Sequence, residues 1–203
     1  MIAYISAAKV KESGKRKVST TVETGRLMEI ALNSIGGEVL RGKVGDVNVA
    51  YLAKETDSAL GVEGVGVYIF PELGYYPDSI FAALYLLDNL ESMEQVRDFI
   101  RALPDLSLKK IKIQCPNKLK QSVIARLKDV VPAQMMVTTG KQPRVNTIDG
   151  LRVEFPDSWF LIRPSGTEPV IRIIVESISP YQTDQLIAEG RKLVESVISL
   201  SKK

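Results

Sequence analysis

The sequence predicts two consecutive domains of different fold class. We expect an α/β domain with a mixed, largely parallel sheet, followed by an α+β domain with an antiparallel sheet covered by two helices. The first expectation rests on strand and helix patterns that alternate up to about residue 100. The second rests on a run of consecutive strand patterns flanked by helical ones. Residues 104–107 interrupt the alternation, so we expect domains at 1–106 and 107–203.

The first domain is expected to alternate helices and strands along the chain. The side chain of Thr24 should cap a helix that is closed by Gly36 and Gly37. Pro77 should open a strongly apolar helix, because proline is favoured in the first helical turn. The expected elements are a helix at 2–12, a strand at 18–21, a helix at 25–34, a strand at 38–41, a helix at 46–54, a strand at 67–70 and a helix at 80–90.

The second domain is expected to begin with a strand at 110–114 and a helix at 118–130. Several strands should follow between residues 145 and 176, and a helix at 181–200 should close the chain. Apolar residues recur at helical spacing along this last helix, which predicts the face that covers the sheet. They are Leu186, Ile187, Leu193, Val194 and Val197.

The chain contains no histidine, which excludes several kinds of catalytic and metal site. A Ser-His-Asp triad, a Cys-His pair and a histidine-bearing zinc site all need that side chain. The glycine-rich nucleotide-binding motifs GxxxxGK[ST] and GxGxxG are also missing from the sequence. The net charge of +3 suits an anionic ligand without requiring one.

Cys115 is the only cysteine, so the sequence offers no intramolecular disulfide and the reducing cytoplasm is the expected location. No apolar run reaches the roughly 18 residues of a transmembrane helix, and we expect no membrane partner. The first apolar stretch lacks the preceding basic residues of a signal peptide. Basic clusters at 15–17 and 109–112 have no interleaved aromatic residues, so we do not expect a nucleic-acid partner.

The segment Arg163-Pro-Ser-Gly-Thr-Glu-Pro lies between two stretches rich in strand-forming residues. If the apolar alternate residues of both strands face the helices, Arg163 and Arg172 emerge together on the open side, near the loop. Arginine binds phosphate bidentately, and the backbone N–H groups of a tight turn form an anion-binding concavity. The hydroxyls of Ser165 and Thr167 and the N–H group of Gly166 therefore suit a phosphate monoester. The alternative is an ordinary hairpin loop in which Glu168 pairs with an arginine at the surface.

The sequence RPSGTEP followed by VIRIIVE resembles the signature of the last domain of the α-D-phosphohexomutases. This family includes phosphomannomutases, phosphoglucomutases and phosphoglucosamine mutases. Weaker similarities occur in family order upstream, so the resemblance covers nearly the whole chain as the third and fourth domains. They are Lys43-Val-Gly-Asp46, the stretch from Gly61 to Pro71, Asp78 before an apolar helix, Asp149-Gly150 and EFPDSWFLIR.

The resemblance implies a role in carbohydrate metabolism, with a hexose phosphate as the ligand. Family members are isomerases that move a phosphoryl group between two oxygens of one sugar, through a phosphorylated serine and Mg²⁺. By resemblance, Glu63 would contact the sugar. The residues implied to hold the phosphate that is not transferred are Arg163, Ser165, Gly166, Thr167 and Arg172.

Two departures from the family pattern change the expectation. The segments that carry the catalytic serine and the Mg²⁺ ligands belong to the first two domains, and neither occurs here. We therefore expect no catalytic residue, cofactor or metal in this chain, no turnover by it alone, and a missing or separately encoded N-terminal half as a partner. In the sugar loop, Val65 stands where the family usually has Ser or Asn, and Val67 where it often has His; the valine side chains cannot hydrogen-bond. A non-catalytic phosphosugar-binding or regulatory module remains the alternative function.

Overall fold

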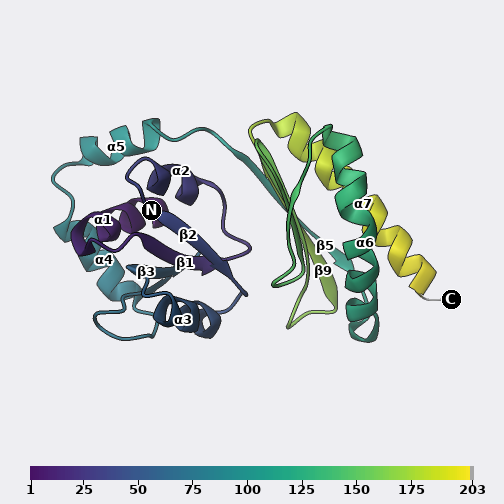
Figure 1. Cartoon of the computed structure of the whole chain (residues 1–203), viewed down its shortest axis with the longest axis horizontal. Coiled ribbons are helices and arrows are strands. Elements are labelled where there is room, and N and C mark those ends of the chain that lie inside the picture. The colour runs from purple at the N-terminus through teal and green to yellow at the C-terminus, as the bar shows by residue number, and fades with distance from the viewer. Residues whose placement is uncertain (202–203) are drawn as a thin grey trace. The chain divides into compact units, whose positions relative to one another are not determined.

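The computed structural model describes residues 1–201. The chain forms two compact units, Met1–Pro104 and Asp105–Lys203 (Figure 1).

The first unit is built on a four-stranded sheet with the order β2-β1-β3-β4. Strand β1 pairs in parallel with β2 and β3, and β4 is antiparallel to β3. This arrangement confirms the mixed, largely parallel sheet. The strands are β1 (Lys17–Thr21), β2 (Glu38–Gly42), β3 (Leu60–Glu63) and β4 (Val67–Ile69).

Helices cover both faces of this sheet (Figure 1). Helices α1 (Ile2–Ser13), α2 (Leu27–Asn33) and α4 (Ser79–Asp88) share a buried core with one face. Helix α3 (Asp46–Glu55) packs on the other face through Val49 and Ala50. Helix α5 (Met93–Arg101) completes the unit.

The structure corrects four expectations for this unit. Thr24 does not cap a helix: α2 begins at Leu27, and the Thr24 hydroxyl hydrogen-bonds Thr20 Oγ1 at 2.7 Å. Pro77 precedes α4, whose cap is the Asp78 carboxylate, which accepts the N–H of Phe81. Strand β3 was not expected, because it has only four residues, one of them a glycine. Helix α5 was not expected either; none of its residues is fully buried.

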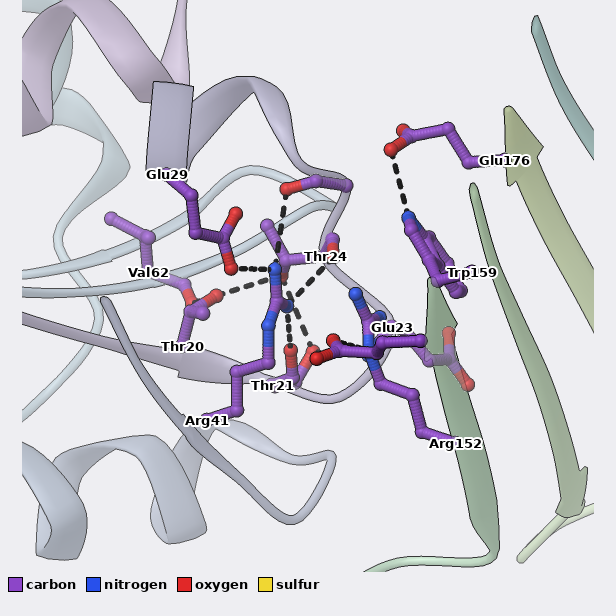
Figure 2. Close-up of polar contacts among 12 residues, drawn as sticks. Thr20, Thr21, Glu23, Thr24, Glu29, Arg41, Val62, Arg152, Trp159 and Glu176 are labelled. Carbon is purple, nitrogen blue, oxygen red and sulfur yellow. Dashed lines mark hydrogen bonds and ion pairs between the residues drawn. The ribbon is translucent and has the colours of Figure 1, made fainter. Parts of the chain in front are cut away.

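A buried arginine organises the loop that follows β1 (Figure 2). The guanidinium of Arg41 donates to the carbonyl oxygens of Thr21 at 3.0 Å and Thr24 at 2.7 Å, and also pairs with Glu29. Only 9% of the Arg41 side chain is exposed. Backbone carbonyls that a turn leaves unpaired are thereby satisfied, which fixes the loop at the carboxyl end of the strand.

The second unit contains a five-stranded sheet with the order β5-β9-β8-β7-β6, in which every adjacent pair is antiparallel. Helices α6 (Lys120–Thr139) and α7 (Pro180–Ser201) lie on the same face (Figure 1), as expected. A short 3-10 turn, η1 (Asn117–Leu119), leads into α6. The strands are β5 (Ser107–Gln114), β6 (Arg144–Asn146), β7 (Leu151–Phe155), β8 (Ser158–Pro164) and β9 (Val170–Ser177).

Helix α6 is longer than the sequence indicated, because it continues through Pro132 to Thr139. Proline removes one helical hydrogen bond and usually ends or bends a helix. Here Val131 and Met135, on either side of Pro132, are fully buried in the core, and this burial holds the second half of the helix in place. Gly140 caps the end of the helix in the left-handed conformation, with φ of 68°.

Candidate functional site

The loop at residues 164–169 connects β8 to β9, and basic side chains line the strands beside it. Arg163 lies directly opposite Arg172, and Arg172 lies opposite Lys112 on β5. Directly opposed residues of an antiparallel pair project from the same face. The alternate residues, Ile162 and Ile173, are buried in the core under the helices. The basic row therefore lies on the helix-free face, next to the loop.

The Ser165 side chain shapes the loop from within. Ser165 is 4% exposed, and its Oγ accepts the N–H of Glu168 at 3.2 Å. The Ser165 N–H donates to the carbonyl of Val170 at 3.0 Å, which closes the loop across its base. The Oγ retains its own proton as a donor, so Ser165 combines a structural contact with the capacity for one further hydrogen bond.

Gly166 and Thr167 form the exposed tip of the loop. Neither backbone conformation nor packing requires glycine at position 166: its φ is outside the left-handed region, and an added Cβ would meet no atom within 4 Å. A glycine that the fold does not need is useful where a ligand approaches the backbone closely. The tip thus presents an accessible N–H group and a threonine hydroxyl.

Lys120, which the sequence pattern did not point to, holds the loop from the side of α6. Its ammonium donates to the carbonyl oxygen of Ser165 at 2.6 Å and to that of Glu168, although Lys120 is only 7% exposed. The Cys115 N–H donates to the carbonyl of Pro169 at 2.8 Å, so the segment before α6 is tied to the same loop. One signal could have identified Lys120: a lysine at the first position of a helix opposes the helix dipole.

Glu168 pairs with two members of the basic row. Its carboxylate contacts Lys112 Nζ at 2.8 Å and Arg172 Nη2 at 2.9 Å. The hydrogen bond from Lys112, and then that from Arg172, lowers the pKa of Glu168 below its ordinary value. The structure therefore contains the Glu168–arginine pair that an ordinary hairpin loop would also have. The buried Nε atom of Arg172 has no hydrogen-bond partner.

Asp149 orients Arg163 from the turn before β7. The Asp149 carboxylate accepts Arg163 Nε at 2.8 Å, and the two side chains are 20% and 13% exposed. The adjacent Gly150 has φ of 87°, and a Cβ there would lie 2.3 Å from the carbonyl oxygen of Ile162. Only glycine permits the turn to lie this close to β8, so the Asp149-Gly150 pair fixes the direction of the Arg163 side chain.

A second set of polar contacts lies on the same face of the sheet, farther from the loop. Trp159 Nε1 donates to Glu176 Oε1 at 2.8 Å (Figure 2). The Arg152 guanidinium carbon lies 3.8 Å from the centre of the Trp159 ring, and Arg152 Nε contacts Glu154 at 2.5 Å. These contacts fix the tryptophan and rigidify the central strands.

In the first unit, Glu63 lies at the carboxyl end of β3, where ligands of open α/β sheets usually bind. Its carboxylate accepts the N–H of Gly45 at 2.7 Å, just before α3, and the residue is 7% exposed. Val65 is 84% exposed at the tip of the β3–β4 loop. Glu63 thus has a structural partner, and the tip beyond it presents an apolar side chain.

No group of three or more His, Cys, Asp and Glu side chains that could hold a metal ion occurs within residues 1–201. Over the same range, no helix is long and apolar enough to cross a membrane.

Two family models match consecutive parts of the chain. Residues 1–106 match "Phosphoglucomutase/phosphomannomutase, alpha/beta/alpha domain III", and residues 111–193 match the C-terminal domain of the same family. The chain is 34% identical over 198 residues to a probable phosphoglucosamine mutase of Pyrococcus horikoshii, covering 98% of this chain and 43% of that protein. It is also 34% identical over 191 residues to a phosphoglucosamine mutase of Methanococcus maripaludis, covering 94% of this chain and 41% of the relative.

Solved structures agree on the fold. A phosphoglucomutase/phosphomannomutase family protein of Burkholderia thailandensis is similar, with a TM-score of 0.73 and 24% identity. The match covers 96% of this chain and 40% of that protein. The chain thus spans less than half the length of the relatives that it matches, and lines up with their third and C-terminal domains. The chain belongs to the phosphoglucomutase/phosphomannomutase family and corresponds to the C-terminal part of the family's proteins.

Proposed function

We propose that this chain is the phosphosugar-binding C-terminal portion of a phosphohexomutase, and that loop 164–169 holds the phosphate that is not transferred. The observation that carries the proposal is the row of Arg163, Arg172 and Lys112 beside a loop with an accessible glycine N–H. Arginine forks and backbone N–H groups are the donors that phosphate monoesters require.

The charge around the loop supports a doubly charged ligand. The cationic side chains are Arg163, Arg172, Lys112 and Lys120, and the carboxylates paired with them are Asp149 and Glu168. This concentration of cationic side chains beside the loop suits a doubly charged phosphate monoester.

In the complete enzyme, this grip would orient the reacting end of the sugar. Holding a remote phosphate converts binding energy into positioning of the group that reacts. The phosphoserine and metal segments would come from an N-terminal half, so we infer that this chain does not turn over hexose phosphates alone. We also infer a cytoplasmic location, since the single cysteine, Cys115, is a buried free thiol.

The proposal is tested by calorimetric titration of the chain with glucose 1-phosphate, mannose 1-phosphate and free glucose. The phosphorylated sugars should bind with about 4–6 kcal/mol, corresponding to submillimolar to millimolar dissociation constants. Arg163→Ala should abolish this binding. Arg126→Ala, which removes an exposed arginine from α6, should leave it unchanged. Equal binding by both variants would contradict the proposal.

A second candidate function is a non-catalytic phosphosugar-binding or regulatory module. The exposed Val65 at the tip of the β3–β4 loop favours it, because this side chain cannot hydrogen-bond a sugar hydroxyl. Adding an N-terminal half with the phosphoserine and metal segments distinguishes the two. Turnover by the mixture would support the mutase, whereas saturable phosphosugar binding without turnover would support the module.

A further inference from the structure

Lys120 carries a buried positive charge whose described partners are neutral. Lys120 is 7% exposed, and its ammonium hydrogen-bonds the carbonyl oxygens of Ser165 and Glu168. It forms no ion pair with a carboxylate among residues 1–201. The nearby Glu168 carboxylate is directed instead to Lys112 and Arg172.

A buried charge without a counter-ion is costly, and proteins rarely keep one unless it has a use. The carbonyl dipoles of the loop recover part of that cost. The amino end of α6, where Lys120 is the first residue, brings the positive end of the helix dipole to the same place. Instead of opposing the lysine with a carboxylate, the fold concentrates positive potential beside the loop.

Ser165 and Glu168 flank the exposed tip formed by Gly166 and Thr167. By holding both carbonyl oxygens, the ammonium turns them toward α6 and fixes the backbone on either side of the tip. The N–H groups at the tip are then left for an external anion, because in a tight turn the carbonyl and N–H groups point in different directions.

We propose that Lys120 is a positioning residue that presets loop 164–169 and supplies the buried charge which makes the loop prefer a phosphate monoester dianion over a monoanion. This inference rests on the phosphate-binding function proposed above. It assigns the preference for charge to a residue that does not itself contact the ligand.

The test compares two ligands: glucose 1-phosphate at pH 8, a dianion, and its methyl diester, a monoanion. Lys120→Gln keeps an N–H donor for the loop carbonyls but removes the charge. Lys118→Gln is the matched control, since Lys118 is exposed in the turn before α6. Thermal unfolding followed by the fluorescence of Trp159, the single tryptophan, reports whether each variant folds.

We expect Lys120→Gln to weaken dianion binding about tenfold, the effect of one nearby charge at a partly shielded site. Monoanion binding should weaken much less, and the control should match the wild type for both ligands. Equal losses for the two ligands in a folded Lys120→Gln variant would mean that Lys120 only supports the backbone, and would overturn the inference. Unchanged binding of both would overturn it too. A wild-type chain that binds neither ligand would instead overturn the proposed function, and this inference with it.

If Lys120→Gln does not fold, Lys120→Arg provides the second variant, because it keeps both charge and donors. The preference of the wild type for the dianion should then persist in Lys120→Arg. Its loss would overturn the inference.

Discussion

Replacing Gly150 by alanine tests whether the Asp149-Gly150 turn holds the phosphate site together. The φ of 87° at this position costs an L-residue about 1–2 kcal/mol. The added Cβ would also lie 2.3 Å from the carbonyl oxygen of Ile162 and 3.0 Å from Arg163 Cα. Both atoms belong to the backbone of a central strand, so relieving the overlap should cost a further ~1–3 kcal/mol.

The expected loss of stability for Gly150→Ala is therefore about 2–5 kcal/mol. Gly140→Ala is a matched control in the same unit: φ is 68°, but an added Cβ would meet no atom within 4 Å. Gly140→Ala should lose only the stability that the unfavourable backbone conformation costs, about 1–2 kcal/mol. The difference between the two variants isolates the close approach of the turn to β8.

Urea unfolding monitored by Trp159 fluorescence measures both variants, because this tryptophan is fully buried in β8. Gly150→Ala should also weaken glucose 1-phosphate binding in the folded protein, since the displaced Asp149 no longer orients Arg163. Gly140→Ala should bind normally. Equal stability losses in the two variants would refute the steric argument, and normal ligand binding by Gly150→Ala would refute the role of the turn in positioning Arg163.

Three further predictions concern the loop and the first unit. Arg163→Lys should weaken glucose 1-phosphate binding about tenfold in calorimetry, because lysine keeps the charge but lacks the planar fork; equal affinity would mean that charge alone matters. The affinity of the wild type for glucose 1-phosphate should increase about tenfold from pH 5 to pH 7.5. Over this range the phosphate loses its second proton near pH 6, while Glu168, with its lowered pKa, stays ionised. An affinity that does not change with pH would contradict a preference for the dianion. Tyr85→Phe should destabilise the protein by about 1 kcal/mol at pH 7, measured by urea unfolding monitored by circular dichroism. The variant loses the hydrogen bond that the Tyr85 hydroxyl donates to Glu12 at 2.7 Å, and the loss is modest because Glu12 is partly exposed to water. That hydrogen bond lowers the pKa of Glu12, so the stabilisation is present above the ordinary value of 4.5 and is lost as the pH falls through the lower folded value. A stability difference between the two proteins that does not decrease as the pH is lowered below 4.5 would contradict this assignment.

Sequence patterns predicted the elements whose burial is regular. The alternation through β8 and β9 predicted that Arg163 and Arg172 lie on the same face, where the structure pairs them directly. The spacing of Leu186 and Val194 predicted the covering face of α7. Two short elements of the first unit were missed: β3 has four residues, one of them Gly61, and α5 has nine, none of them fully buried. Sequence patterns also failed at Pro132, where burial of the flanking residues outweighs the local cost of proline.

The loop could be proposed as an anion site from the sequence because its chemistry is local. Hydroxyls, a glycine and an arginine within a few residues indicate an anion site without knowledge of the fold. Lys120 and Asp149 were not assigned to it, because the sequence does not reveal which distant side chains the fold brings to the loop. Thr24 shows the converse error: its side chain suits a helix cap, but a partner across the turn, Thr20, takes its hydroxyl.

The most direct test of the central claim is a ¹H–¹⁵N spectrum of the chain, recorded while glucose 1-phosphate is added. If loop 164–169 holds the phosphate, the largest and saturable shifts should fall on the backbone N–H groups of Gly166 and Thr167, and inorganic phosphate should reproduce them. Free glucose should leave them unchanged. Saturable shifts that spare this loop, or no shifts from either phosphate in the folded protein, would contradict the claim.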